Sequence, residues 1–149
     1  MYRASKRFAI PHKPFNGKLV AYASGPKEEA FLEALTREQP INLKYKFWLR
    51  HYENILLLKP PAFKHYFPCI ARSLAEGLLP LDPHGPDLLN EGFFYYTESH
   101  TYFFRDCNTD DPKSLSQKQY LPKLLAELNQ EELEFLLTWH RLYLSLYDL

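Results

Sequence analysis

The acidic loop that begins at Asp106 carries the residue types of a calcium-binding loop. Asp106, Asn108 and Asp110 match the first, third and fifth positions of an EF-hand, where oxygen ligands bind the ion. The sixth position should be glycine and is Asp111, and the twelfth should be glutamate and is Gln117. Because both failures fall at the most demanding positions, the favoured interpretation is an acidic helix-capping region without calcium.

A second combination of ligand types overlaps the start of this loop. Glu98, His100 and Asp106 offer two carboxylates and an imidazole, which can hold zinc or another transition metal if the chain brings them together. A metal held there could activate water, so a metal-assisted hydrolase that uses these residues is one alternative function. The other histidines show neither a His-x-x-x-His nor a His-Glu-x-x-His spacing. We therefore predict no bound metal and no cofactor, and we keep the hydrolase as an alternative.

Neither cysteine has the surroundings of a catalytic nucleophile. Cys69 follows a proline within an apolar stretch, which is typical of a packed thiol. Cys107 has acidic neighbours, and negative charge disfavours the reactive thiolate. The chain has 5 glycines, none in the Gly-x-x-x-x-Gly-Lys pattern of a phosphate-binding loop. A non-catalytic protein is therefore favoured over an enzyme, although these residues do not decide between the two.

Charge is distributed unevenly although the formal net charge is zero. Residues 1–75 contain 13 Lys and Arg against 5 Asp and Glu, and residues 76–149 contain 5 against 13. The halves either attract each other in the folded chain or present charged faces that steer a partner. The basic half, around Lys44, Lys46 and Arg50, makes nucleic-acid binding a second alternative. The aromatic run that could stack bases belongs to the acidic half, however, so nucleic acid is disfavoured as a partner.

The size and composition are those of one folded domain. The 149 residues suffice for one hydrophobic core, and 16% aromatic residues argue against disorder. No apolar run approaches the roughly 20 residues of a membrane span, the N-terminus lacks the apolar core of a secretory signal, and two cysteines do not make a disulfide scaffold. We expect a single domain over residues 1–149, located in the cytoplasm without a membrane partner, with residues 1–18 as a basic and partly flexible arm.

A buried helix near the middle of the chain, between Leu56 and Leu78, is expected to organise the fold. Pro61 suits its first turn. Pro68 interrupts the hydrogen-bond ladder and predicts a kink or a break into two short helices. Gly77 predicts a left-handed cap at its end. The apolar face of this helix consists of Phe63, Phe67, Ile70, Ala71 and Leu74.

Two further helices are expected before this one. The first opens at Pro26, which suits the first helical position, and is stopped by Pro40. The second is capped by Asn42, and its apolar stripe continues to Leu56. A strand is the rival for its first half, but the length of the stripe favours a helix.

The last helix is expected over residues 130–149. Asn129 and Glu132 form a capping box, and Leu128 with Leu133 can form the hydrophobic staple. The helix is apolar over most of its circumference, which predicts burial. Its single polar stripe consists of Glu131, Glu134, Thr138, Arg141, Ser145 and Asp148.

Two segments favour β-structure. A short strand is expected near residues 19–23, and the nearly symmetric aromatic run at residues 93–104 favours a small hairpin. Its turn residues, Glu98 and Ser99, are poor hairpin formers, so helical backbone stays an alternative there. The predicted fold class is therefore mainly α, a compact domain of about five or six helices with small β additions.

Residues 57–68, LLKPPAFKHYFP, contain a Leu-x-Pro-x-Ala-Phe-x-x-Tyr-x-Pro motif. The motif resembles that of a small helical bacterial family described as a domain of unknown function. Residues 128–132 are similar to the cap that opens the family's last helix, whereas the Pro60-Pro61 pair and the aromatic run depart from the pattern. The resemblance implies a structural motif that places a helix start and a kink, and it carries over no catalytic residue. By analogy, small helical proteins of this kind resemble immunity proteins encoded beside bacterial toxins.

The leading hypothesis is a bacterial, non-catalytic protein-binding protein, specifically an immunity protein that neutralises a toxin. Aromatic anchors surrounded by charge suit protein interfaces. The acidic half would dock onto a toxin domain with a basic surface. The partner's identity and the oligomeric state stay open. The residues predicted to bind the partner are Glu91, Tyr95, Tyr96, Glu98, Tyr102, Asp106, Asp110 and Asp111.

Overall fold

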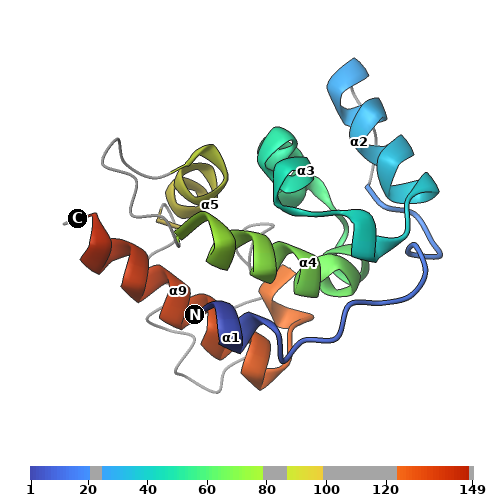
Figure 1. The fold of residues 1–149 in the computed structure, drawn as a ribbon. Coiled ribbons are helices and arrows are strands. Elements are labelled where there is room, and N and C mark those ends of the chain that lie inside the picture. Colours follow the sequence, from blue (N-terminus) through green and yellow to red (C-terminus); the bar gives the residue numbers. More distant parts are fainter. Residues whose placement is uncertain (21–24, 79–86, 99–123, 148–149) are drawn as a thin grey trace.

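Helix α4 (Pro60–Leu78) runs through the middle of the molecule, and the other helices pack around it (Figure 1). The arrangement is that of a computed structural model, and it describes residues 1–20, 25–78, 87–98 and 124–147, with residues 95–98 as backbone only. Within this part the fold is mainly α, as predicted.

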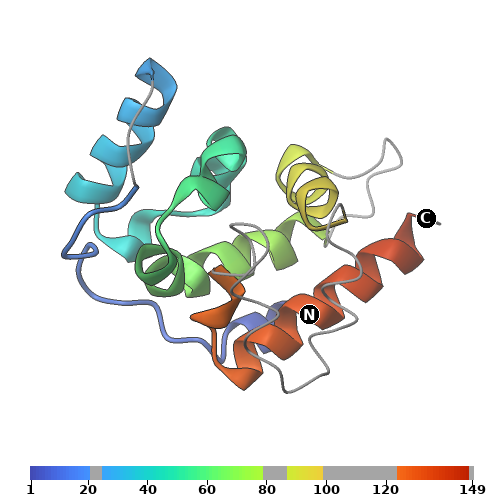
Figure 2. The same ribbon diagram turned by 180° about the vertical axis from the view of Figure 1, so that it is seen from behind.

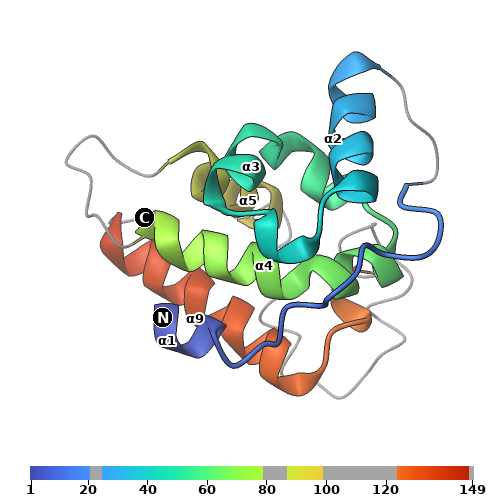
Figure 3. The ribbon, with the colours of Figure 1, turned by 45° about the vertical axis from the view of Figure 1, so that its right-hand side comes forward.

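Two layers of helices enclose α4. On one side lie α3 (Tyr45–Arg50) and α5 (Leu88–Glu98), and on the other lie α1 (Tyr2–Ser5) and α9 (Gln130–Leu146) (Figures 1 and 3). Seen from behind, α2 projects at the edge of the molecule, far from α5 and α9 (Figure 2). The remaining described elements are α2 (Pro26–Arg37) and two short 3₁₀ helices, η1 (Pro40–Asn42) and η2 (Tyr52–Leu57).

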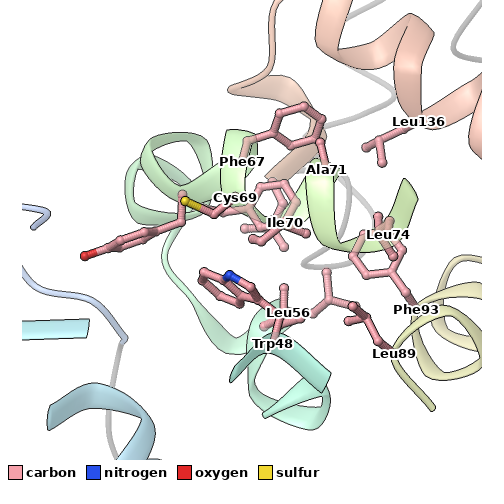
Figure 4. Close-up of a cluster of buried hydrophobic side chains, with 14 of the residues drawn as sticks. Trp48, Leu56, Phe67, Cys69, Ile70, Ala71, Leu74, Leu89, Phe93 and Leu136 are labelled. Carbon is pink, nitrogen blue, oxygen red and sulfur yellow. The ribbon is translucent and has the colours of Figure 1, made fainter. Parts of the chain in front are cut away.

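The core forms around α4 because this helix is apolar on nearly every side. Twelve of its residues are buried. Figure 4 shows side chains from three neighbouring helices pointing toward them: Trp48 from α3, Leu89 and Phe93 from α5, and Leu136 from α9. Burial of one large apolar side chain stabilises a fold by about 1.5–3 kcal/mol. The helix that collects the most such side chains therefore becomes the centre of the fold.

Of the two outcomes predicted for Pro68, a kink or a break into two short helices, the break is wrong, because α4 continues through this residue. Proline in a helix interior costs about 3 kcal/mol, because its ring displaces a carbonyl and its nitrogen donates no hydrogen bond. Pro68 is itself buried, and large buried residues such as Phe67 and Ile70 adjoin it on the same helix. Their combined burial exceeds the cost of the proline, and the helix is kept.

The single helix expected from Asn42 to Leu56 is also wrong, because this segment is divided into η1, α3 and η2. The indole Nε1 of Trp48 donates to the carbonyl of Leu43 at 3.0 Å, and the first amides of the helix donate to the carbonyl of Lys44. The helix begins after it, at Tyr45, and Asn42 makes no side-chain cap. After α3, the 3₁₀ turns of η2 rotate the chain and bury Ile55.

The expected β-structure does not form in the described residues. A hairpin was predicted over residues 93–104. Residues 93–98, which would form its first strand, belong to α5, so this part of the prediction is wrong. Residues 99–104 lie outside the described part. Phe93 and Phe94 are neighbours that both enter the core, which a helix permits and alternating strand residues do not. Of the strand expected near residues 19–23, residues 21–23 lie outside the described part, and Val20 makes one isolated antiparallel bridge to Leu58.

The N-terminal 18 residues, expected as a basic arm, follow the surface of α4 and are held at several points. Ser5 and Phe8 are buried. The amide of Phe15 donates to the Tyr66 hydroxyl at 3.0 Å, and His65 Nε2 lies 2.8 Å from the Lys13 carbonyl oxygen. The backbone is thereby fastened to α4, and the basic side chains of this segment are exposed. In the described ranges, every helix is too short or too polar to cross a membrane.

The start of α9 is as predicted. Glu132 donates its amide to Asn129 Oδ1 and accepts from the Asn129 amide, each at 2.9 Å, which completes the capping box. The Glu132 carboxylate, 3% exposed, also accepts from Lys64 of α4. The cap therefore joins α9 to the central helix as well as starting it. Five members of the predicted polar stripe are exposed, namely Glu131, Glu134, Thr138, Arg141 and Ser145, and Asp148 lies outside the described residues.

Candidate functional site

The predicted partner-binding residues fall on α5 and on the segment that follows it. Glu91 is half-buried on α5, and Tyr95, Tyr96 and Glu98 belong to the same helix, of which only the backbone is described at these positions. The other predicted residues, Tyr102, Asp106, Asp110 and Asp111, lie outside the described part. Within the described part, the candidate site is therefore the outer face of α5, and we define it by Leu88 and Glu91.

Helix α5 is started by Asp87, whose side chain acts as an N-cap. Its Oδ1 accepts from the amide of Asn90 at 2.7 Å and from the Asn90 side-chain nitrogen at 3.0 Å. Its Oδ2 accepts from the hydroxyl of Tyr45 on α3. Burial, together with this hydrogen bond to a carboxylate, raises the pKa of Tyr45, so the phenol stays protonated and donates. Asp87 therefore fixes both the start of α5 and its position beside α3.

Asn90 connects α5 to α9. Its Oδ1 accepts from the indole Nε1 of Trp139 at 2.8 Å, and both side chains are fully buried. The same contact surface holds two aromatic pairs: Phe93 packs edge-on against Trp139, and Phe94 stacks on Tyr143 at a centroid distance of 4.2 Å. The polar bond fixes the register of two helices that aromatic packing alone would allow to slide.

Two glycines allow the helices to approach α5 closely. A Cβ on Gly77 of α4 would overlap the Asp87 carboxylate and the Asn90 amide. A Cβ on Gly92 of α5 would lie 2.5 Å from Cδ2 of Tyr52 in η2. Gly77 has helical backbone inside α4, so the left-handed cap predicted for it is wrong, and its function is close contact between helices.

These contacts decide which side of α5 faces outward. Leu89, Asn90, Phe93 and Phe94 are buried, and in a helix their positions cover one side. The opposite side begins with Leu88, which is 56% exposed although it is a large apolar residue, and continues one turn later with Glu91. By helical spacing, positions 95 and 98 continue the same side. The outer face of α5 thus combines an exposed leucine with a carboxylate.

The two oppositely charged halves of the sequence contact each other in the structure: Lys64 pairs with Glu132, and Arg7 lines the same hollow as Glu131 and Glu134. Beyond residue 75, the described residues include eight Asp and Glu and one basic residue, Arg141. Asp87 and Glu132 serve as internal hydrogen-bond acceptors, whereas Glu127, Glu131 and Glu134 are exposed. Lys44, Lys46 and Arg50, which suggested nucleic-acid binding, are exposed on or beside α3.

Among the described residues, the one thiol is buried and no metal-ligand cluster occurs. Cys69 is 2% exposed, burial raises the pKa of its thiol to about 12, and its Sγ lies 3.4 Å from the Pro40 carbonyl oxygen, so it is a packed thiol as predicted. No group of three or more metal-ligating His, Cys, Asp or Glu occurs in the described ranges. The proposed ligands His100 and Asp106 are outside these ranges.

Comparison of the chain with protein-family models, curated proteins and solved structures gives no match. The resemblance of residues 57–68 to a bacterial family therefore stays a prediction. In the structure these residues do place a helix start, since α4 begins at Pro60.

The residues that position the site were missed in the sequence, although one of them carried a signal. Asp87 precedes a helical stretch and lies three positions before Asn90, which is the spacing of an N-cap side chain and the backbone amide that donates to it. The partner of Asn90, Trp139, is 49 positions away, and no local pattern connects them. The exposure of Leu88 follows only from the packing of the opposite side of α5.

Proposed function

We propose that the chain is a cytoplasmic, non-catalytic protein-binding protein whose contact surface is the outer face of α5 together with the acidic segment that follows it. The observation that carries the proposal is the combination on α5 of an exposed apolar side chain, Leu88, and an acidic neighbour, Glu91, on a helix held rigidly from behind. A rigid face with an apolar anchor and a charged surround suits protein recognition, because little conformational entropy is lost on binding.

The acidic character of this half favours a basic partner. On this face, Glu91 of α5 and the acids Asp106, Asp110 and Asp111 of the segment that follows supply a negative potential. Such a potential accelerates encounter with a positively charged protein. The specific form of the proposal is an immunity protein that covers the basic surface of a bacterial toxin domain.

The experiment has two stages. The tagged protein is first used to capture a partner from the lysate of its host at low and moderate salt, and the partner is purified. Association with the wild type and with the Asp110→Lys/Asp111→Lys variant is then followed by stopped-flow fluorescence. We expect slower association for the variant at low salt and a smaller difference at moderate salt, because salt screens exposed charges.

The control carries the same change in charge on another face. The Glu29→Lys/Glu33→Lys variant alters two exposed acids on α2, which projects away from α5 (Figure 2). It should associate nearly as fast as the wild type. Equal effects of the two variants would show attraction by net charge alone, and an unaffected Asp110→Lys/Asp111→Lys variant would rule out this placement of the site.

A further inference from the structure

A cleft of about 460 Å³ lies on the surface of α4 between α1 and α3, away from the outer face of α5. Figure 3 shows α4 running between these two helices. This volume falls within the roughly 300–1,000 Å³ of small-molecule sites in proteins. The size of the cleft therefore suits a small molecule.

One wall of the cleft is apolar. Ile10 comes from the N-terminal segment, Ile41 from η1, and Leu43 from the turn before α3. Ile41 is 51% exposed, so its side chain offers apolar surface at the cleft. Leu43 is held in place because its carbonyl accepts from the indole of Trp48 at 3.0 Å. This wall can take up an aliphatic or aryl group.

Charged side chains also line the cleft, and most of them are cationic. Lys44, Lys46 and Arg72 line it, and Glu76 is its one carboxylate, so three cations against one anion leave a lining charge of +2. Within the described part of the chain, none of these four residues makes an ion pair. Other polar groups at the cleft are already engaged, since Ser73 donates to the Cys69 carbonyl and Tyr45 donates to Asp87.

Arg72 is the least satisfied of these groups. Its Nη2 donates to the Phe8 carbonyl at 3.3 Å, which holds the guanidinium beside the cleft. Its Nε is buried and has no hydrogen-bond partner, the sole side-chain atom of this kind among the described residues. A guanidinium has five N–H donors and prefers planar acceptors such as carboxylate or phosphate. The half-buried arginine thus lacks the counter-ion that would normally accompany it.

From these observations we propose that the cleft binds a small amphipathic organic anion, with a carboxylate or phosphate head at Arg72, Lys44 and Lys46 and an apolar group against Ile10, Ile41 and Leu43. The head supplies the missing negative charge, and the apolar part covers exposed aliphatic surface. This site is separate from the protein-binding face on α5 and does not depend on it.

The test uses four probes against the full-length protein: octanoate, octyl phosphate, 1-octanol and acetate. Binding is measured by isothermal titration calorimetry and located by amide chemical shifts. We expect saturable binding of octanoate or octyl phosphate at least about tenfold tighter than that of 1-octanol or acetate, because both the head and the chain contribute. The larger shifts should occur at Ile41, Leu43 and Arg72. Comparison of octanoate with octyl phosphate decides which head group the cleft prefers.

Variants separate this site from adventitious binding. Lys44→Gln/Lys46→Gln changes two exposed side chains, so the protein should stay folded, and octanoate affinity should fall at least about fivefold. Arg72→Gln should weaken it further. The control, Lys18→Gln/Lys27→Gln, removes the same charge from exposed positions outside the cleft and should leave the affinity unchanged.

Three outcomes would overturn the proposal. The first is equal affinity for octanoate and 1-octanol, which would indicate an apolar surface without head-group recognition. The second is the absence of saturable binding of either anion up to about 10 mM, the weak end of measurable affinities. The third is a control variant that loses as much affinity as Lys44→Gln/Lys46→Gln.

Discussion

The indole Nε1 of Trp139 donates a 2.8 Å hydrogen bond to Oδ1 of Asn90, and neither side chain is exposed to solvent. The same asparagine donates its side-chain amide to Asp87, which caps α5 and accepts from Tyr45. Four side chains from three helices and a cap therefore form one connected polar network, which runs from the buried Trp139 and Asn90 to the half-buried Asp87 and Tyr45. Such a network stabilises only when every member is satisfied.

Replacement of Asn90 by Ala should destabilise the fold by about 2–4 kcal/mol, because the Trp139 indole and one Asp87 oxygen lose a buried partner. Urea denaturation measures the loss. A double-mutant cycle with Trp139→Phe should give a combined loss smaller than the sum of the two single losses. Additive losses would mean that the hydrogen bond contributes nothing beyond packing.

Replacement of Gly77 by Ala tests the close contact between α4 and α5. Helix propensity alone predicts a gain of about 1 kcal/mol from Gly to Ala in a helix interior. The added Cβ would overlap the Asp87 and Asn90 side chains, so we expect instead a loss of about 2 kcal/mol or more in the free energy of unfolding. Gly25→Ala is the control, because its Cβ would enter open space and should cost less than about 1 kcal/mol. A more stable Gly77→Ala variant would contradict the structure.

The pair of Lys64 and Glu132 should contribute more than an exposed ion pair. Glu132 is buried, and its carboxylate serves both the capping box and the lysine, so Lys64→Met should cost about 1–2 kcal/mol. The lysine side chain is 38% exposed, which keeps the value below that of a fully buried pair. Arg37→Met removes the partner of the exposed Glu33 and should cost at most about 0.5 kcal/mol. Similar losses in chemical denaturation would refute a special contribution of the buried carboxylate.

Stability should fall in mild acid because of His51. Burial, and secondarily the neighbouring Arg50, lowers the pKa of this imidazole below its ordinary value of 6.5. The unfolded chain takes up the proton near that value and the folded chain only at lower pH, so acidification favours the unfolded state. Urea midpoints between about pH 7.5 and 5.5 should therefore decline more steeply for the wild type than for His51→Gln.

The thiol of Cys69 should be inert in the native protein. It is buried, and burial raises its pKa to about 12, so almost no thiolate exists at neutral pH. In a Cys107→Ser variant, which leaves one thiol, iodoacetamide at about pH 8 should label the unfolded protein in urea and leave the native protein unlabelled over the same time. Labelling at equal rates in both states would contradict the packing of α4.

Several features could be predicted from local pattern, and they share a physical basis. The apolar period of α4, the polar stripe of α9 and the capping box of Asn129 and Glu132 involve residues within a few positions of one another. Side chains a few positions apart are brought together by the helical backbone itself, so the order of residue types is enough to predict which of them meet. The same applies to the helix that opens at Pro26.

Other features depended on partners far along the chain. Residues 93–98 have strand-forming aromatics, yet they form a helix because Phe93 and Phe94 can both pack against α9 only from a helix. Pro68 looked like a break, yet the burial around it outweighs its cost. In each case, the free energy gained by burying side chains in the core is larger than the free energy that the local conformational preference costs.

The sequence by itself determined that this chain folds into a mainly α domain, that a helix containing Phe63, Phe67 and Ile70 is its core, and that its two halves differ in charge. The composition and the apolar period of the sequence are enough to predict these properties. The charge of each half is the sum of its residues' charges, and the burial of a helix face depends on how many apolar residues it carries. Only the tertiary structure decided that Gly77 is a contact point, that Asn90 meets Trp139, and that Arg72 borders a cleft without a counter-ion. These are relationships between positions far apart in the sequence, and the chain specifies them only after its helices have packed.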